Sequence, residues 1–225
     1  MVMVETKECR TMASTSFQIN PSPEYDQITE LVPHLFICGA SSLTLDNMNK
    51  YNISLIINAT TEVPSIRSLG SIPRIKLWLD DTPSTDIYQY FDLISDQIET
   101  VIANGGNVLV HCVAGISRSA SICLAFLTKF RCKSLRQAYQ LMAQKRPLVR
   151  PNIGFWRQLI TFESEIKKCM VSVKFVRSRE GPKSVLPDVY LPMANDSRGG
   201  WQFSKDKLKF QPILETVPES TEAGA

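Results

Sequence analysis

A chain of 225 residues is long enough to bury one hydrophobic core, in a domain of about 150 residues with a tail at either end. Its formal net charge of +3 is too small to indicate general nucleic-acid binding, and no stretch approaches the roughly 20 apolar residues of a membrane span. The N-terminus lacks a secretory signal pattern and the six cysteines lack metal-ligand spacing. We therefore expect reduced thiols, no bound metal, and a location in the cytoplasm or the nucleus.

The first third of the chain begins as a tail and continues as alternating strands and helices. Residues 1–26 are rich in Ser, Thr and Pro and show no structural period, which predicts a flexible N-terminal arm. Apolar runs bounded by turn residues then predict three strands and a short helix, the strands within 28–38, at 54–60 and at 75–79, and the helix over 43–51.

The middle of the chain carries the strongest helix signal. Asp86 is a candidate N-cap, apolar side chains recur at helical spacing from 87 to 102, and Asn104-Gly105-Gly106 ends the helix. A buried strand is predicted at 108–111, and further helices follow directly after Arg118, over 135–145 and over 155–166. Strands that alternate with helices predict an α/β fold, with a central, mostly parallel sheet flanked by helices.

The segment from His111 to Ser119 carries the clearest chemistry. The preceding strand delivers Cys112 to a tight loop, five residues separate it from Arg118, and a helix begins there. Backbone N–H groups of such a loop and the helix dipole bind an anion, and the planar fork of Arg118 can hold two phosphate oxygens at once. The same positive field favours the Cys112 thiolate, so the pattern predicts a thiolate that attacks a bound phosphate. The residues expected to hold that phosphate are Val113, Ala114, Gly115, Ile116, Ser117 and Arg118.

Two neighbours of the loop have predicted supporting roles. The hydroxyl of Ser119 can donate to the sulfur of Cys112 and later stabilise that sulfur as a leaving group. His111 is expected to orient the loop by bonding backbone carbonyl groups.

The segment His111–Ser119 resembles the signature loop of the cysteine-dependent protein phosphatases, and the stretch 114–120 is particularly similar to that of the dual-specificity phosphatases. Further similar segments are 35–37, 56–60 and 150–156. The resemblance extends over 27–168 and is greatest to the small, atypical members that lack a separate kinase-docking domain. It implies a dual-specificity phosphatase-like catalytic domain over 27–168 and makes 169–225 a C-terminal extension, partly disordered.

The proton donor for such chemistry is expected on the loop after the strand at 75–79. A carboxyl group there can protonate the departing oxygen and then activate water. Family spacing favours Asp81 as this acid, with Asp80 in reserve, and the alternative is that Asp81 only caps a turn before Pro83. The resemblance also implies that Asn152 fixes the loop through backbone hydrogen bonds, with simple N-capping of the next helix as a close alternative.

The residues and the resemblance together imply a protein phosphatase that needs neither metal nor cofactor. Cys112 attacks phosphorus to give a phosphocysteine, and water activated by Asp81 hydrolyses it. Dual-specificity enzymes act on phosphotyrosine and on phosphoserine or phosphothreonine. Phosphoproteins, with MAP kinases among them, are the partners that the resemblance implies, and no oligomeric state is predicted.

Two other functions remain open from the sequence. One is a phospho-binding scaffold with little activity, which would typically lack the nucleophile or the acid, yet both are present. The other is a phosphatase for a non-protein phosphate such as a phosphoinositide. The loop interior, 113–117, carries no Lys or Arg, which favours phosphoproteins over polyanionic lipids.

Overall fold

The computed structural model describes residues 27–168, 170–177 and 185–191. The predicted arm at 1–26 lies outside these ranges, as does most of the predicted extension. The strands are β1 (Thr29–Val32), β2 (Leu35–Cys38), β3 (Ile53–Asn58), β4 (Arg74–Lys76), β5 (Asn107–His111), β6 (Phe175–Arg177) and β7 (Val185–Pro187). The α-helices are α1 (Leu45–Lys50), α2 (Tyr88–Ala103), α3 (Arg118–Phe126), α4 (Leu135–Lys145) and α5 (Ile153–Lys167). Shorter helical turns are η1 (Ala40–Ser42), η2 (Arg67–Leu69), η3 (Leu127–Arg131) and η4 (Asp188–Tyr190).

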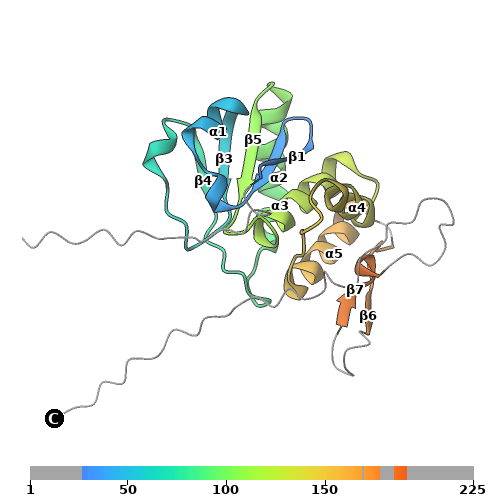
Figure 1. Cartoon of the computed structure of the whole chain (residues 1–225). Helices are drawn as coiled ribbons and strands as arrows, with labels where there is room; N and C mark the ends of the chain where they lie inside the picture. The colour runs from blue at the N-terminus through green and yellow to red at the C-terminus, as the bar shows by residue number, and fades with distance from the viewer. Residues whose placement is uncertain (1–26, 169, 178–184, 192–225) are drawn as a thin grey trace, which may run out of the picture. The chain divides into compact units, whose positions relative to one another are not determined.

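Five strands form the central sheet, in the order β1-β2-β5-β3-β4 (Figure 1). Strand β1 runs antiparallel to β2, and every other neighbouring pair is parallel. The prediction of a mostly parallel sheet flanked by helices is thereby confirmed. Because β5 lies between β2 and β3, its carboxyl end stands in the middle of the sheet edge where α/β folds place ligands.

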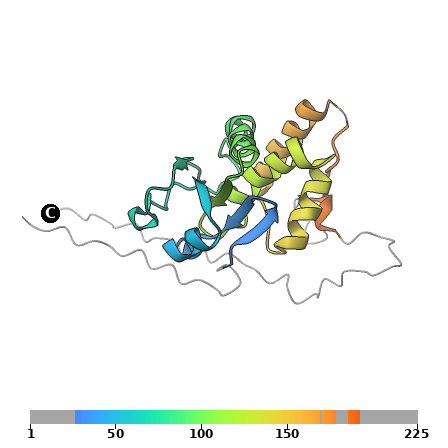
Figure 2. The same cartoon turned by 90° about the horizontal axis from the view of Figure 1, so that it is seen from above.

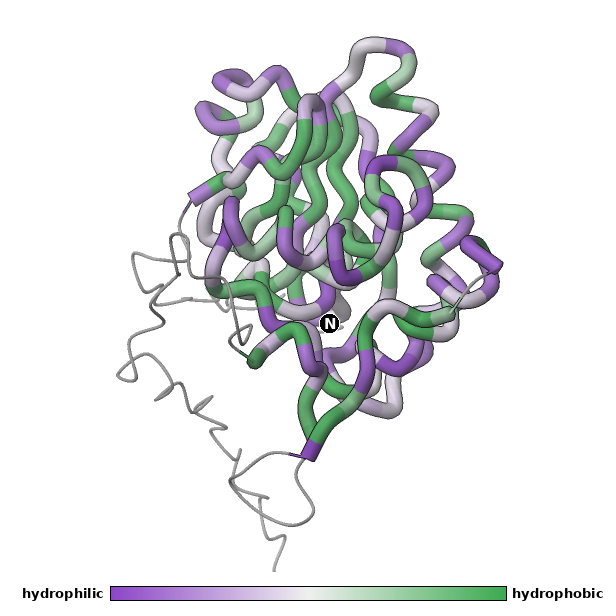
Figure 3. Tube along the Cα trace, turned by 90° about the vertical axis from the view of Figure 1, so that its right-hand side faces the viewer, coloured by the Kyte–Doolittle hydropathy of each residue, from purple (hydrophilic) through white to green (hydrophobic). Residues whose placement is uncertain are grey.

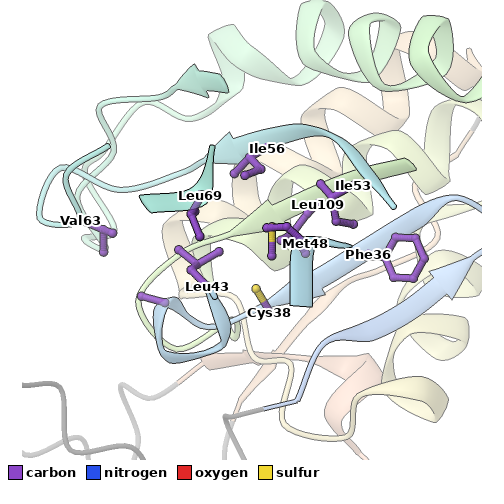
Figure 4. Close-up of a cluster of buried hydrophobic side chains, with 10 residues drawn as sticks. Phe36, Cys38, Leu43, Met48, Ile53, Ile56, Val63, Leu69 and Leu109 are labelled. Carbon is purple, nitrogen blue, oxygen red and sulfur yellow. The ribbon is translucent and has the colours of Figure 1, made fainter. Parts of the chain in front are cut away.

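One face of the sheet packs against α1. Side chains alternate between the two faces of a strand, so Phe36 and Cys38 of β2 point to the same side as Leu109 of β5. Figure 4 shows these side chains gathered with Ile56 of β3 and Met48 of α1 in one buried cluster. Burial of this apolar cluster fixes the register of β5, and with it the position of the loop that follows.

The opposite face is covered by α2 and α3, on which α5 packs, and Figure 2 shows α2 across the sheet from α1. All nine residues of α3 are buried. Phe91 of α2 and Phe162 of α5 extend this core, with ring centroids 5.4 Å apart. In Figure 3 the hydrophobic segments concentrate in the strands of the sheet. No helix in the described ranges is long and apolar enough to cross a membrane.

Residues after α5 are joined to the core by the buried carboxylate of Glu163. It accepts hydrogen bonds from the N–H of Leu135, at the start of α4, and from the N–H and hydroxyl of Ser172. Strands β6 and β7 pair antiparallel with each other, so part of the predicted extension is a small second sheet. The compact unit that contains the central sheet runs to Val189.

Candidate active site

Three loops meet at the carboxyl end of the parallel strands. The loop after β3 carries Glu62, the loop after β4 carries Asp80 and Asp81, and the loop after β5 carries Cys112. The guanidinium of Arg118, the first residue of α3, contacts the carboxylates of both Glu62 and Asp81. The topology therefore brings the predicted nucleophile, arginine and acid together from separate parts of the chain.

The signature loop, residues 112–118, turns donors toward the sulfur of Cys112. The N–H of Gly115 donates to Sγ at 3.2 Å, and the hydroxyl of Ser119 donates to Sγ at 3.1 Å. Gly115 has a φ of +71°, and a Cβ there would lie 2.6 Å from the carbonyl carbon of Cys38. Conformation and space thus both require glycine. Two donors, one from the backbone and one from a side chain, therefore point at this buried sulfur.

A buried arginine outside the loop holds the loop's carbonyl groups. Arg146 donates from Nε to the carbonyl of Gly115 at 2.8 Å and from Nη2 to that of Ala114 at 3.2 Å. Its Nη1 donates to two oxygen atoms at and just before β1. Arg146 therefore fixes the backbone of the loop at two consecutive carbonyl groups. The positive charge of Arg146 also interacts with Cys112.

Arg118 is buried and has one part of its guanidinium bound to the protein. Its Nη1 donates to Oε2 of Glu62 at 2.5 Å and to the carbonyl of Leu79 at 3.0 Å. Its Nε is buried and has no hydrogen-bond partner among the described residues, although Oδ2 of Asp81 lies 3.6 Å away. A buried charged donor left unpaired costs free energy, and an oxygen of a phosphate in the signature loop would satisfy it.

Glu62 is a site residue that the sequence reasoning missed. Burial alone would raise its pKa, but the hydrogen bond and the charge of Arg118 outweigh burial and hold the pKa of Glu62 below its usual value. The ionised carboxylate therefore offsets part of the charge of Arg118. Its loop is fixed at the carbonyl of Val63, which accepts hydrogen bonds from Asn58 at 2.8 Å and from Lys76 at 2.6 Å.

His111 lies at the end of β5 as a buried, neutral side chain. Its Nδ1 is 3.4 Å from the carbonyl oxygen of Cys112, and the predicted orienting role depends on this contact. Burial, together with the charges of Lys76 and Arg118, lowers the pKa of His111 from 6.5 to about 4. The imidazole is therefore uncharged at neutral pH and adds no positive charge to the site.

The two acids that follow β4 have different partners. Oδ1 of Asp81 accepts a hydrogen bond from the hydroxyl of Ser117 at 2.7 Å and from the side-chain amide of Asn152 at 2.9 Å. Asp80 instead accepts from the hydroxyl of Thr61 at 2.6 Å. The structure thus brings Asp81, and not Asp80, to the signature loop.

The acid loop, residues 79–87, is held by a side chain from α5. Oε1 of Gln158 accepts the N–H groups of Ile87 at 2.9 Å and Tyr88 at 2.8 Å, and its amide donates to a carbonyl of the loop. Gln158 therefore caps α2 from another helix. The prediction that Asp86 is the N-cap is wrong, because the first free N–H groups of α2 are already bonded by Gln158.

The start of α5 fits closely against the same loop. A Cβ at Gly154 would lie 1.9 Å from the carbonyl oxygen of Pro83, so only glycine permits this approach. Oδ1 of Asn152 accepts the N–H of Phe155 at 3.0 Å, which caps α5, while the amide of Asn152 donates to Asp81. Asn152 thus caps α5, which was one of the two roles expected for it. Its side-chain amide also binds the acid loop.

Four residues of this arrangement were not found from the sequence: Glu62, Arg146, Gly154 and Gln158. Glu62 follows a predicted strand at the same sheet edge as the acid, and that position was a usable signal. Arg146 and Gln158 stand in or beside helices, where an arginine or a glutamine is ordinarily solvated, and no pattern marks them as buried partners.

The other cysteines close to Cys112 differ from it chemically. Cys38 and Cys123 are fully buried, and burial raises the pKa of both thiols. They are therefore expected to stay protonated and unreactive. No group of three His, Cys, Asp or Glu residues suited to a metal ion occurs in the described ranges, and the expectation of a metal-free reaction stays a prediction.

Comparison with known proteins places this geometry in a family. The family model described as dual specificity phosphatase, catalytic domain, matches residues 35–165. Mouse dual specificity protein phosphatase 14 is 40% identical over 164 residues, which cover 72% of this chain and 80% of that protein. Human dual specificity protein phosphatase 21 is 38% identical over 184 residues, which cover 80% and 94%. The crystal structure of human DUSP28 superposes with a TM-score of 0.60 at 27% identity, over 65% of this chain and 97% of that one. The chain therefore belongs to the dual-specificity phosphatase family.

Proposed function

We propose that this chain hydrolyses phosphotyrosine and phosphoserine or phosphothreonine in proteins through a phosphocysteine formed on Cys112. Membership of the family supports protein phosphatase activity. One observation carries the assignment of the residues: a sulfur that receives two hydrogen bonds stands in the same loop as the buried Nε of Arg118, which has no hydrogen-bond partner in the described part of the chain. A nucleophile and an anion-binding donor in one short loop suit attack on a phosphate.

The first step transfers the phosphoryl group to the enzyme. Sγ of Cys112 attacks phosphorus, the S–P bond forms, and the bond from phosphorus to the substrate oxygen breaks. Asp81 gives its proton to that oxygen, which leaves as a phenol or an alcohol. Arg118 and the loop N–H groups stabilise the negative charge on the three other oxygens.

The second step regenerates the enzyme. Water attacks phosphorus, its proton passes to the carboxylate of Asp81, and the S–P bond breaks. The hydroxyl of Ser119, 3.1 Å from Sγ, stabilises the departing thiolate. Inorganic phosphate then leaves the loop, and Asp81 is protonated for the next cycle.

We propose phosphoproteins as the substrate class and MAP kinases as particular substrates within it. The neutral interior of the signature loop, 113–117, supports a phosphoprotein over a polyanionic inositol lipid. Resemblance to the dual-specificity phosphatases supports MAP kinases, and a peptide doubly phosphorylated on a Thr-x-Tyr segment represents such a target.

The test measures phosphate release from that peptide, with reductant and without added metal, by the wild type and three variants. The wild type is expected to release phosphate from both residues, and Cys112→Ser to release none. Asp81→Asn should be slower by about 10²-fold, because general acid catalysis contributes at least that much. Asp80→Asn is the matched control and should stay near the wild type.

Three results would change this conclusion. Release from tyrosine alone would restrict the specificity. Release from a phosphoinositide but from no peptide would make the chain an enzyme for a non-protein phosphate. Phosphopeptide binding by the folded, reduced wild type without any turnover would make it a phospho-binding scaffold.

A further inference from the structure

A hollow beside the catalytic arginine is not used by the mechanism above. It has a volume of about 380 Å³. The residues that line it are Thr61, Glu62, Pro64, Ser65, Lys76 and Trp78. One of them, the indole of Trp78, is 70% exposed. An exposed indole is a large flat apolar surface, and such surfaces occur more often at binding sites than elsewhere.

The hollow adjoins the phosphate site through Glu62. Glu62 lines it and pairs with Nη1 of Arg118 at 2.5 Å. Trp78 directly precedes Leu79, whose carbonyl accepts a hydrogen bond from the same Nη1 at 3.0 Å. Glu62 and Trp78, two residues that line the hollow, are thus held next to Arg118, the arginine that is proposed to bind the phosphate. A peptide with its phosphoresidue in the signature loop would pass a neighbouring residue close to Trp78.

The charged groups around the hollow already have partners. The carboxylate of Glu62 pairs with Arg118, and that of Asp80 accepts from Thr61. The ammonium of Lys76 donates to a carbonyl at 2.6 Å and lies 4.8 Å from the centroid of the Trp78 ring. A charged side chain of either sign would meet a like charge here. A neutral, flat side chain would meet the exposed indole without that repulsion.

We propose that this hollow binds an aromatic side chain of the substrate, one that flanks the phosphorylated residue. The proposal rests on the proposed phosphoprotein function and adds a sequence preference to it. Trp78 is the specificity-determining residue, because it offers the ring on which the substrate side chain stacks, while Pro64 and the stem of Lys76 form the sides.

The test compares phosphopeptides that differ only in the residues next to the phosphorylated one, which are Phe, Ala, Glu or Lys. The wild type should prefer the Phe peptide over the Ala peptide by roughly tenfold in kcat/KM, the size of one stacked aromatic contact. Trp78→Ala should bring this ratio close to 1, and Trp78→Phe, which keeps a ring, should restore most of it. Leu93→Ala is the matched control, since Leu93 is 60% exposed on α2 and does not line the hollow.

A second measurement does not depend on turnover. Cys112→Ser should bind the phosphopeptides without cleaving them, and binding of the Phe peptide should change the tryptophan emission more than binding of the Ala peptide. The additional change Trp78→Phe should remove that difference.

The outcomes separate the subsite from the function. A wild type that cleaves all four peptides at similar rates, or a Trp78→Ala variant that keeps the Phe preference, overturns the subsite alone. A wild type that cleaves none of them overturns the subsite and the protein phosphatase function together.

Discussion

The signature loop and the acid loop meet at one site but are held in place differently. The signature loop lies between β5 and α3, and the donors to the sulfur of Cys112 come from Gly115 of the loop and from Ser119 in the first turn of α3. The acid loop follows a strand of three residues and is fixed by α5, some 70 positions along the chain. The donors to the nucleophile are thus encoded in one short segment, whereas the position of the acid depends on the packing of a distant helix.

The variant with the largest expected effect tests whether the signature loop keeps its conformation without support from outside the loop. Arg146→Lys would replace a guanidinium that donates to the carbonyls of Gly115 and Ala114 with a single ammonium group that cannot reach the same set of acceptors. We expect kcat/KM to fall about 10²-fold for phosphopeptides and aryl phosphates alike, because the loop backbone would lose the geometry that aligns its donors with the phosphate, and one misplaced donor costs that much.

The control for this variant is the same substitution elsewhere. Arg136→Lys changes an arginine that pairs with Asp188 at 2.7 Å, away from the three catalytic loops. It should keep kcat/KM near the wild type. If Arg146→Lys also keeps it, the loop holds its conformation without distant support and the contrast is sharper than the hydrogen bonds indicate.

The acid loop gives the next largest effect. In Gly154→Ala the new Cβ would lie 1.9 Å from the carbonyl oxygen of Pro83, so the loop that carries Asp81 must move. Turnover of a phosphopeptide should fall roughly 30-fold, because its leaving group needs the proton. An aryl phosphate with a good leaving group needs little protonation and should lose much less.

A glycine distant from the site separates this effect from simple destabilisation. Gly105 has a φ of +77°, and a Cβ added there would meet no atom within 4 Å, so Gly105→Ala strains the backbone without a steric clash. It should lower stability and leave both activities unchanged. Equal losses on the two substrates in Gly154→Ala would mean that the signature loop has moved as well.

The contrast between the loops also explains which features the sequence could predict. The strands, helices and signature loop depend on local period and on residues within a short segment, so Cys112 and Arg118 could be predicted directly from the sequence. Family spacing predicted Asp81 as the acid, but neither Gln158 nor Gly154, which hold its loop, was predicted. Gln158, and not Asp86, caps α2, because this side chain from another helix accepts the free N–H groups where α2 begins. Local patterns carry no record of such a contact.

We expect the stability of the protein to depend on pH through His111, the last residue of β5. The pKa of His111 falls from 6.5 to about 4 on folding, so the unfolded chain binds a proton more tightly than the folded chain. The stability that the neutral imidazole of His111 contributes is fully present above pH 6.5 and is lost as the pH falls toward 4. Between pH 7 and pH 5 this group should cost about 2 kcal/mol of the free energy of unfolding.

Urea unfolding at the two pH values measures this cost. His111→Asn cannot titrate, so its stability should change less than that of the wild type by about that amount, while other groups contribute equally to both proteins. Parallel pH dependence in the two proteins would show that His111 is protonated as easily in the folded chain as in the unfolded one.

The smallest expected effect lies where the two loops are joined. Asn152 caps α5 through Oδ1, donates from its amide to Asp81 at 2.9 Å, and donates from its backbone N–H to the hydroxyl of Ser117 at 3.2 Å. Asn152→Ser keeps a good N-cap residue and the backbone N–H but removes the amide. We expect unchanged stability within about 0.5 kcal/mol, and a threefold to fivefold fall in kcat for phosphopeptides.

Asn152→Ala completes the comparison, because it removes the cap and the amide together. It should lose about 1 kcal/mol of stability in addition to the same fall in kcat. If Asn152→Ser keeps the full kcat while Asn152→Ala loses stability alone, then Asn152 only caps its helix, and Asp81 is held by Ser117 of the signature loop. In that case the acid would owe its final position to the locally encoded loop, and the distant helix would determine only how closely the acid loop approaches it.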